Sequence, residues 1–487
     1  MPQFGWTHDD GVYFTCGKAL ASGEGYRIAS LPDQPWQTKY PPLYPLLLSA
    51  VWRISPQFPD NLQLASLMSW LFLPATMMLV YWLYGHFGFS RVAIWTMLAF
   101  LALNPYVHFF SISLLSEFPF LLLLLAVFLL APRRPVLGGL LAGLAYLTRT
   151  AGVPLLIVIP GLLLWRRQTG DALKFALAML PFVAGWMGWS AAHRSVVDDP
   201  YLMYYLDYVW YERYVINAGN ILTVVWKNFD SVLTGIGTFI VPTVDNPAEK
   251  ALAWTLAVGA IIGVYKLVRA RVEVLPYAIY AVCLALMLIF WHYPSNPRFL
   301  FPIFPLLLAG LAYQVQLTFM AIRKVYLDGT QRGAAIVVST MLAGVAAVVV
   351  WSNVNFLLSA EPGFYRNQRA ARDETVSCLR AGLPEGAKVL TNKDALVYLI
   401  TNRWAMRMNI PPQYWYEDRM KDAVQEIARV EPYARSHGLT HLFYSTRVEG
   451  DLSSDQQAKL IRELESSVGI KVSYRCGNAT LYELLRP

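Results

Sequence analysis

The stretch HDDGVYFTCGKALASGEGYRIASLPDQPWQTKYPPLYP, residues 8–45, decides how the rest of the chain is interpreted. It begins with two adjacent carboxylates, Asp9 and Asp10, and ends with a proline-rich element around Pro41. Mostly apolar sequence follows it as far as residue 356. A charged side chain is costly at membrane depth, so a carboxylate pair next to apolar helices is expected to face water or a binding site.

The composition indicates a membrane protein. Of 487 residues, 56% are hydrophobic and 15% are charged, against about 25% charged residues in soluble domains. Repeated apolar runs are long enough to cross a bilayer, which needs about 20 residues as a helix. A net charge of +8 suits anionic lipid headgroups. The Lys and Arg residues sit in short loops and not on one stripe, so no nucleic-acid partner is expected. We therefore predict an α-helical polytopic protein in contact with the lipid bilayer.

Ten segments have the apolar composition of membrane spans. They are residues 61–84, 91–112, 117–132, 136–149, 151–165, 172–192, 249–268, 274–292, 299–320 and 333–356. Residues 41–55 are apolar but short and bounded by proline, which predicts a helix lying at the membrane interface.

Basic residues fix the expected orientation of these spans. They fall in alternate short loops, which the positive-inside rule makes cytoplasmic: Arg91, Arg133, Arg134, Arg166, Arg167, Lys266, Arg269, Arg271, Arg323, Lys324 and Arg332. The opposite set is then extracytoplasmic: residues 1–60, the turns at 116–117, 149–150 and 292–298, the loop 193–248, and the tail from about 357. The sequence carries no eukaryotic targeting feature, so we expect a bacterial inner membrane. Because residues 1–6 do not resemble a signal peptide, we also expect a further transmembrane helix upstream of Met1.

The chain divides into three predicted parts: an extracytoplasmic loop with an interfacial helix (1–60), a transmembrane core (61–356) and a soluble α/β domain (357–487). In the last part, strand-like segments 387–392, 441–445 and 470–475 alternate with helix-like segments 368–381 and 418–437. It has no glycine-rich phosphate loop, so a cap is expected and not a second enzyme. Cys378 and Cys476 both lie in it and could pair.

The loop 193–248 is rich in Tyr and Trp. Aromatic side chains settle at the membrane–water boundary, which favours helices lying on the bilayer. Stacking against a sugar, or an acceptor channel, is the alternative.

Asp9 and Asp10 have two interpretations. A carboxylate can take a proton from an acceptor nucleophile, and a neighbouring carboxylate can raise one pKa or help hold a divalent cation. Alternatively, either residue could cap a helix that begins near Val12. Their place before a membrane, together with the motifs below, favours chemistry.

Three further motifs lie on the same predicted side. In Lys39-Tyr40-Pro41-Pro42-Leu43 the prolines suit a first helical turn, and Lys39 could reach a lipid phosphate or snorkel to water. Glu117 begins an apolar helix. The helix dipole favours an acid at that position, but an acid beside apolar sequence can also mark a functional site. Arg298 opens an apolar span where the positive-inside rule does not explain it, and Arg is suited to clamp a phosphate. Arg149 lies at a similar depth, and His292 is expected at the interface.

Together these motifs resemble the GT-C superfamily of integral-membrane glycosyltransferases, of the family 39, protein O-mannosyltransferase and lipid A aminoarabinose transferase type. In that group an acid pair is followed by Tyr, as are Asp9-Asp10 by Tyr13. A Lys-Pro-Pro-Leu element follows, matched by Tyr40-Pro41-Pro42-Leu43 with Lys39 displaced by one residue. Glu117 matches a later acid, and Arg298-Phe299-Leu300-Phe301-Pro302 matches an Arg-aromatic-Leu-x-Pro element. The resemblance spans about residues 8–320.

The resemblance implies transfer of a hexosyl or pentosyl group from a polyprenyl-phosphate donor, with inversion, to an acceptor hydroxyl or phosphate at the outer face. Asp9 would be the general base, and Asp10 and Glu117 would shape the acceptor site or hold a divalent metal. Arg298, Lys39 and Arg149 would bind the donor phosphate. Tyr13, Tyr40 and His292 would contact sugar or acceptor. Protein, lipid and glycan acceptors stay open, and so does the metal.

Two other classes of protein share this polytopic composition. A lipid or sugar transporter or flippase usually has internal repeats and broken helices with polar residues at the midplane; no repeat is visible here, and the acids lie at helix ends. A membrane scaffold would not need Asp9, Glu117 and Arg298 on one side.

Overall fold

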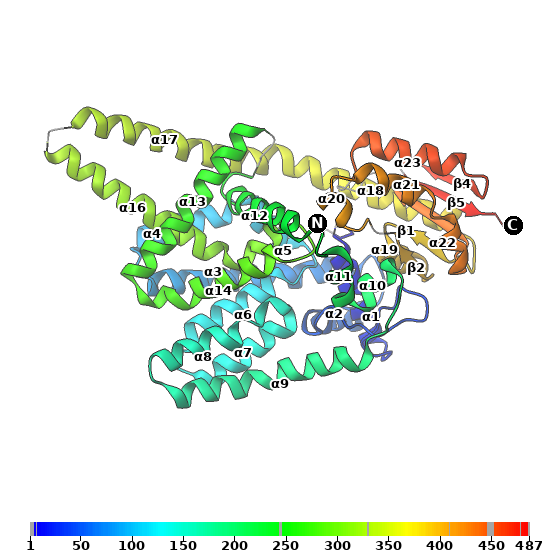
Figure 1. The fold of residues 1–487 in the computed structure, drawn as a ribbon, viewed down its shortest axis with the longest axis horizontal. Coiled ribbons are helices and arrows are strands. Elements are labelled where there is room, and N and C mark those ends of the chain that lie inside the picture. Colours follow the sequence, from blue (N-terminus) through cyan, green and yellow to red (C-terminus); the bar gives the residue numbers. More distant parts are fainter. Residues whose placement is uncertain are drawn as a thin grey trace.

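A bundle of helices and a smaller α/β domain make up the described chain (Figure 1). The computed structural model describes residues 4–5, 7–242, 246–328, 331–408, 410–445, 452–477 and 479–485. The α-helices before the α/β domain are α1 (His8–Ala21), α2 (Leu43–Ile54), α3 (Asn61–His86), α4 (Arg91–Ala102), α5 (Pro105–Ile112), α6 (Glu117–Leu130), α7 (Pro135–Thr148), α8 (Leu155–Trp165), α9 (Thr169–His193), α10 (Pro200–Leu206), α11 (Tyr208–Val215), α12 (Ile221–Thr238), α13 (Pro247–Ala270), α14 (Leu275–Ile289), α15 (Pro297–Leu300), α16 (Phe304–Asp328) and α17 (Arg332–Asn355). Short 3₁₀ turns η1 (Thr150–Gly152), η2 (Val272–Val274) and η3 (Phe301–Ile303) join some of them.

All ten predicted spans are helical, but a count of ten membrane crossings is not confirmed. Within the described residues, six helices are long and apolar enough to cross a bilayer, and α4 with α5, bent by 62°, would make a seventh. Helices α6 and α7 have 14 residues each, which at 1.5 Å per residue gives about 21 Å. That is less than the roughly 30 Å thickness of a hydrocarbon core. Length is therefore what separates these segments from clear spans.

Small residues let neighbouring helices approach closely. Gly263 on α13 faces Gly310 on α16, where an added Cβ would lie 1.9 Å from the Gly310 carbonyl oxygen. Close approach of backbones through small residues is the usual way that membrane helices pack.

Helix α17 exposes apolar side chains along most of its length, including Met341 and Trp351, and it extends with α16 away from the bundle in Figure 1. Such a surface suits lipid and not water.

The C-terminal domain, defined here as residues 361–485, contains one five-stranded sheet in the order β2-β1-β3-β5-β4. Strands β1 and β2, and β1 and β3, run parallel; β3 and β5, and β5 and β4, run antiparallel. Its elements are α18 (Glu361–Gly382), β1 (Val389–Thr391), α19 (Asp394–Thr401), β2 (Ala405–Arg407), α20 (Gln413–Tyr416), α21 (Met420–Ala428), α22 (Glu431–Ser436), β3 (His441–Ser445), α23 (Ser454–Ser466), β4 (Ile470–Cys476) and β5 (Ala479–Leu484).

The predicted α/β character of this domain is confirmed, with two corrections. The strands predicted at 387–392, 441–445 and 470–475 are β1, β3 and β4, but β2 and β5 were not foreseen. Strand β2 is only three residues long, too short to show an alternating pattern. The single helix predicted at 418–437 is two helices, because Pro432 starts a new first turn in α22.

The last apolar helix enters the domain without a loop. Helix α17 continues through the turn η4 (Phe356–Ala360) into α18, which packs on β4 and β5. A disulfide joins Cys378 on α18 to Cys476 on β4, with Cα atoms 5.7 Å apart. The pairing that the sequence left open is thus present, and the sheet is covalently tied to the helix that leaves the bundle.

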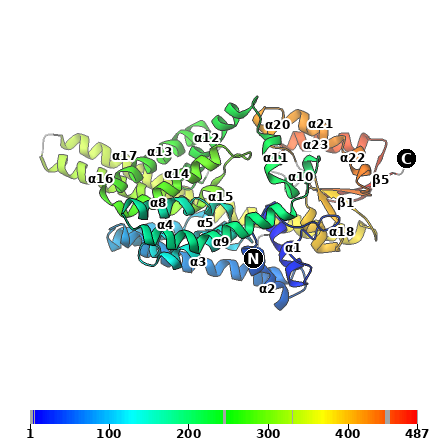
Figure 2. The ribbon, with the colours of Figure 1, turned by 60° about the horizontal axis from the view of Figure 1, so that its bottom comes forward.

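Helix α1 lies where the bundle meets the C-terminal domain (Figure 2). It packs against α2 on one side and α19 on the other. At Gly11 an added Cβ would lie 2.6 Å from the Cβ of Ala395, closer than real side chains approach. Glycine after the two carboxylates therefore lets α1 dock on the domain, and this places Asp9 and Asp10 at the junction.

Candidate active site

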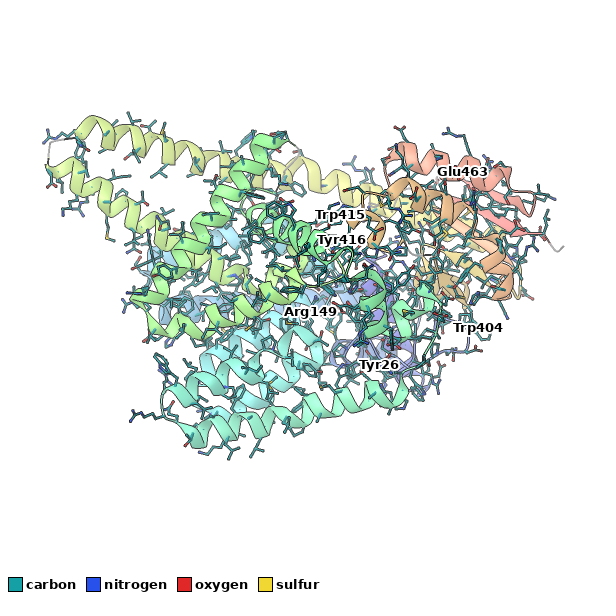
Figure 3. The ribbon with its side chains drawn as sticks, viewed as in Figure 1. Tyr26, Arg149, Trp404, Trp415, Tyr416 and Glu463 are labelled. Atoms are coloured by element: carbon teal, nitrogen blue, oxygen red, sulfur yellow. A yellow bond between two sulfur atoms is a disulfide. The ribbon has the colours of Figure 1, made fainter. Side chains whose placement is uncertain are left out.

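A cavity of about 740 Å³ lies at this junction. Arg149 lies in the middle of Figure 3, between the bundle and the C-terminal domain. All predicted site residues except Glu117 line the cavity, together with residues of the domain. Its charged, polar and aromatic lining includes His8, Asp9, Asp10, Tyr13, Lys39, Tyr40, Arg149, Tyr204, Tyr208, Glu212, His292, Arg298, Lys393, Asp394 and Arg407.

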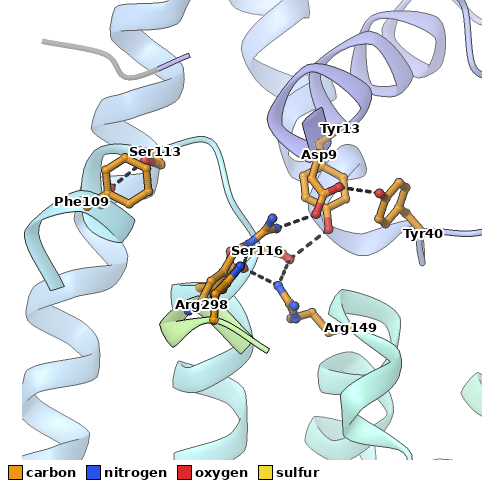
Figure 4. Close-up of polar contacts among 10 residues, drawn as sticks. Asp9, Tyr13, Tyr40, Phe109, Ser113, Ser116, Arg149 and Arg298 are labelled. Atoms are coloured by element: carbon orange, nitrogen blue, oxygen red, sulfur yellow. Dashed lines mark hydrogen bonds and ion pairs between the residues drawn. The ribbon is translucent and has the colours of Figure 1, made fainter. Parts of the chain in front are cut away.

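Asp9 sits in the first turn of α1. The helix begins at His8 and its N-cap is Thr7, so the alternative in which Asp9 or Asp10 caps a helix near Val12 is wrong. Asp9 Oδ1 accepts a hydrogen bond from the hydroxyl of Tyr40. Its Oδ2 lies 2.7 Å from Arg298 Nη2. Figure 4 shows both contacts.

Glu117 is the first residue of α6, and its side chain is fully buried. Its Oε1 accepts hydrogen bonds from Arg298 Nε and from Arg149 Nη1, the latter at 2.5 Å. Arg149 also donates to Ser116 Oγ at 3.2 Å, and Ser116 Oγ is 3.2 Å from the Tyr13 hydroxyl (Figure 4). The paired charges Asp9, Arg298, Glu117 and Arg149 thus form one continuous network, which we call the core cluster.

Asp9 and Asp10 have different electrostatic environments although they are adjacent. Burial alone would raise the pKa of Asp9, but Arg298, Lys39 and the hydrogen bond from Tyr40 outweigh it and hold that pKa well below its ordinary value. Burial raises the pKa of Asp10 to about 7, although Lys393 and the Gly5 N–H, which donates at 2.9 Å, partly offset it. Asp9 is therefore ionised and paired, whereas Asp10 titrates near neutral pH.

Lys39 turns toward the cavity and lies on aromatic rings. Its Nζ is 3.1 Å from the ring centre of Tyr204 and 4.7 Å from that of Tyr208. Burial, together with the nearby cations Arg407 and Arg298, lowers the pKa of Lys39 well below its ordinary value, although Asp9 opposes this. Cation–π contacts of this kind hold an ammonium group without neutralising it.

His292, expected at the membrane interface, is buried within the protein. Its ring packs edge-on against Tyr208 and Tyr211, with centres 5.0 and 5.2 Å away. Its Nδ1 is 3.6 Å from a carboxylate oxygen of Glu212. Burial lowers the pKa of His292 against the influence of Glu212, so the ring is neutral at pH 7. It lines the same cavity as Asp9 and Arg298 and offers a hydrogen-bonding group to a ligand.

The aromatic loop 193–248 divides between both predicted roles. Tyr204 and Tyr208 line the cavity, and Tyr205 and Tyr211 are buried next to it. Trp210 and Trp226 are exposed, as residues at a membrane boundary would be. Tyr204 and Tyr208 therefore belong to the cavity, whereas Tyr201 lines a separate pocket.

The C-terminal domain contributes residues that were not predicted. Asp394 accepts a hydrogen bond from the Tyr205 hydroxyl at 2.9 Å, and its other oxygen is 3.3 Å from His8 Nε2. His8 Nε2 is also 2.8 Å from the Tyr205 hydroxyl. Lys393 donates to the Gly5 carbonyl at 3.0 Å. One signal was available: Thr391-Asn392-Lys393-Asp394 is a polar run at the carboxyl end of a buried parallel strand, where sites commonly lie in α/β sheets.

A divalent metal does not fit the donor set that the structure describes. Among residues 4–5, 7–242, 246–328, 331–408, 410–445, 452–477 and 479–485, no three His, Cys, Asp or Glu side chains gather closely enough to hold one. Asp9 and Glu117 are instead neutralised by arginines.

Comparison with known proteins identifies the fold. No protein-family model matches the chain, and no curated protein matches its sequence. A crystal structure of ArnT from Cupriavidus metallidurans bound to undecaprenyl phosphate matches 99% of this chain and 95% of its own, with a TM-score of 0.54 and 14% identity. This chain has the ArnT fold.

The apo form of the same protein gives a similar result. It matches 98% of this chain and 94% of its own, with a TM-score of 0.51 and 15% identity. The shared ArnT fold therefore includes both the helical bundle and the C-terminal domain.

Proposed function

We propose that this protein is a membrane glycosyltransferase that moves a sugar from a polyprenyl-phosphate donor to an acceptor hydroxyl or phosphate, with inversion. The observation that carries the proposal is the core cluster, in which a candidate base, Asp9, shares a cavity wall with the phosphate-binding group Arg298. The ArnT fold supports it, since one of the matching structures holds undecaprenyl phosphate. The donor is thus expected to be a polyprenyl lipid.

An apolar groove offers a place for the lipid tail. It has a volume of about 510 Å³ and is lined by Tyr26, Pro42, Leu147, Pro181, Phe182, Gly185, Trp186 and Trp189. Tyr26 donates a hydrogen bond to the Tyr40 carbonyl at 2.8 Å, so the groove adjoins the loop that carries Lys39 and Tyr40. A tail in the groove would place its phosphate near the cavity.

The core cluster suggests how the base is activated. While Arg298 pairs with Asp9, the Asp9 carboxylate is a weak base. A donor phosphate competes with Asp9 and Glu117 for the guanidinium of Arg298. Loss of that cation raises the proton affinity of Asp9, because burial opposes its charge. Donor binding would thereby prepare the base.

The transfer then proceeds in one displacement. The acceptor oxygen attacks the anomeric carbon as its proton passes to Asp9, and the bond from that carbon to the phosphate oxygen breaks. The polyprenyl phosphate leaves with its charge stabilised by Arg298 and Lys39. Asp10, which lines the cavity, shapes the acceptor side, and Glu117 holds Arg298 and Arg149 from behind the cavity wall. A phosphate acceptor would already be ionised and would need the base less.

We place this reaction at the outer face of a bacterial inner membrane, with the C-terminal domain extracytoplasmic. The alternating basic loops support that orientation, and so does the disulfide Cys378–Cys476, since disulfides persist in oxidising compartments. The acceptor would be a protein, a lipid or a glycan of the cell envelope.

Asp9→Asn and Asp10→Asn in the full chain, reconstituted with polyprenyl-phosphate sugars, test the assignment. Loss of a general base costs about 10²–10⁴-fold in rate, and we expect Asp9→Asn to show it for a hydroxyl acceptor. Asp10→Asn should retain most activity.

The pH profile separates the two carboxylates. If Asp10 were the base, the wild-type transfer rate would rise with pH through the Asp10 pKa of about 7. The Asp10→Asn variant would then lose sugar transfer. Unchanged transfer by Asp9→Asn would refute the role of Asp9. Lipid translocation by the wild type without any sugar transfer would favour the transporter or flippase alternative.

A further inference from the structure

Two cations, Lys39 and Arg407, line the same cavity from separate parts of the chain. Lys39 comes from the loop before α2, and Arg407 is the last residue of β2 in the C-terminal domain. They are close enough that the charge of Arg407 acts on Lys39. The domain therefore contributes a positive charge to the cavity at the junction.

Neither cation is neutralised by an ion pair. Within the described part of the chain, no carboxylate forms a salt bridge with Lys39 or with Arg407, and Arg407 Nε is buried without a hydrogen-bond acceptor. Asp394 is the carboxylate whose charge acts on Arg407. Both Asp394 oxygens are already engaged, by His8 and by Tyr205.

This arrangement is costly for a purely structural contact. Like charges repel strongly where solvent is excluded, and an unsatisfied buried guanidinium N–H carries a desolvation cost. The aromatic rings around the two cations add to the site: Tyr204 lies under Lys39 and also acts on Arg407. An anion between Lys39 and Arg407 would offset the repulsion between their charges. It would also accept a hydrogen bond from Arg407 Nε, which has no acceptor in the structure.

We propose that Lys39 and Arg407 form an anion-binding subsite, in which the C-terminal domain binds substrate directly through Arg407. The ligand is an oxyanion such as a phosphate, for which the planar guanidinium is well suited. The identity of that ligand rests on the proposed function, whereas the existence of the subsite does not. Two sources are available: the phosphate of the polyprenyl donor, or an anionic group on the acceptor.

The test uses the full chain in lipid nanodiscs and two probes. Binding of undecaprenyl phosphate reports the donor phosphate, and thermal stabilisation by inorganic pyrophosphate at constant ionic strength reports a free oxyanion. The variants are Arg407→Gln, Arg407→Lys and the control Arg403→Gln. Arg403 lies just before β2, four residues from Arg407 in the sequence; its substitution removes the same charge, and it is not among the residues that line the cavity.

We expect Arg407→Gln to weaken at least one probe by about 10- to 100-fold, the usual effect of losing a charge-assisted hydrogen bond. Arg403→Gln should stay within about twofold of wild type, as expected for a screened surface charge. Arg407→Lys keeps the positive charge but lacks the planar guanidinium with its paired N–H donors. Its loss of probe binding should therefore be smaller than that of Arg407→Gln. It also remains informative if Arg407→Gln does not fold.

The two probes distinguish the sources. Weaker binding of undecaprenyl phosphate assigns the subsite to the donor, whereas loss of the pyrophosphate effect alone assigns it to another anion. If the wild type bound pyrophosphate through Arg407 but bound no undecaprenyl phosphate, the subsite would stand and the proposed donor would fail. Normal binding of both probes by folded Arg407→Gln, or equal loss with Arg403→Gln, would overturn the proposal.

Discussion

The two walls of the cavity hold their charges in opposite ways. In the core cluster, on the bundle side, Asp9 and Glu117 are each paired with an arginine, and Glu117 with two. On the domain side, Arg407 has no ion pair within the residues described. A ligand phosphate must therefore displace carboxylates from the first wall but can bind the second without displacement.

This difference separates two tasks. Paired charges in the core cluster hold the elements that carry them in one arrangement. Arg298 of α15 contacts Asp9 of α1 and Glu117 of α6, and Arg149, the residue after α7, contacts Glu117 as well. An unpaired cation holds nothing in the absence of ligand, but its charge is available at once. We infer that the bundle wall maintains the geometry of the reacting groups, whereas the domain wall provides initial attraction for an anionic substrate.

The largest expected effect comes from breaking the bundle wall at Glu117. Glu117→Gln leaves Arg298 and Arg149 sharing a neutral acceptor, and loss of one partner of a buried ion pair costs about 3–5 kcal/mol. We expect a large fall in the free energy of unfolding, measured by thermal or denaturant unfolding in detergent, together with loss of activity.

An exposed ion pair provides the control for Glu117→Gln. Asp171 is 3.0 Å from Lys174 on the surface of α9, and such pairs contribute about 0–1 kcal/mol. Asp171→Asn should therefore have little effect. If Glu117→Gln were as stable as Asp171→Asn, the core cluster would not be a structural element.

A somewhat smaller effect is expected from loosening the domain wall through its disulfide. Loss of a disulfide typically costs about 2–5 kcal/mol, and here the loss falls on the contact of α18 with β4. We expect Cys378→Ser to increase hydrogen exchange in β4 and β5 while leaving α6 and α7 protected.

Comparing the single and double cysteine variants tests whether loss of the disulfide itself causes the increased hydrogen exchange. Cys476→Ser and the double variant should match Cys378→Ser, because all three lack the same bond. Equal loss of protection in α6 would mean that the two walls do not behave as separate units.

The same two walls differ in how much of them the sequence predicts. Asp9, Glu117, Arg149 and Arg298 stand out because each is a charge at the edge of an apolar segment, where an ordinary membrane helix would not carry it. Their pairing was not predictable, since it depends on how α1, α6 and α15 meet in space. The acids were expected to face substrate, and in the structure they face arginines.

Arg407 and Asp394 gave no comparable signal. Both lie in a segment of mixed polarity where charged residues are common, and β2 is too short for a pattern. Their function depends on long-range docking of α19 on α1, which no local sequence rule describes. In the bundle, a functional charged residue can be recognised because the surrounding sequence is apolar. In the C-terminal domain, a functional charged residue cannot be told from the solvated charged residues around it.

The smallest expected effect concerns the contact between the walls. The Tyr205 hydroxyl joins the aromatic loop to Asp394 of the domain and to His8, which precedes Asp9. Tyr205→Phe removes these hydrogen bonds, at a cost of about 1 kcal/mol each. It also frees one oxygen of Asp394 to pair with Arg407. We therefore expect a modest fall in stability and a several-fold weaker affinity for the anion that Arg407 binds.

Tyr433→Phe is the matched control for this last step. The Tyr433 hydroxyl also joins the domain to the loop, through Asp199 at 2.7 Å, but it lines a separate pocket. Both variants should lose similar stability, and only Tyr205→Phe should change pyrophosphate or undecaprenyl phosphate binding. If Tyr433→Phe weakened binding equally, the position of the whole domain would control the subsite. If neither did, Asp394 would not compete for Arg407, and the domain wall would be independent of the hydrogen bonds beside it.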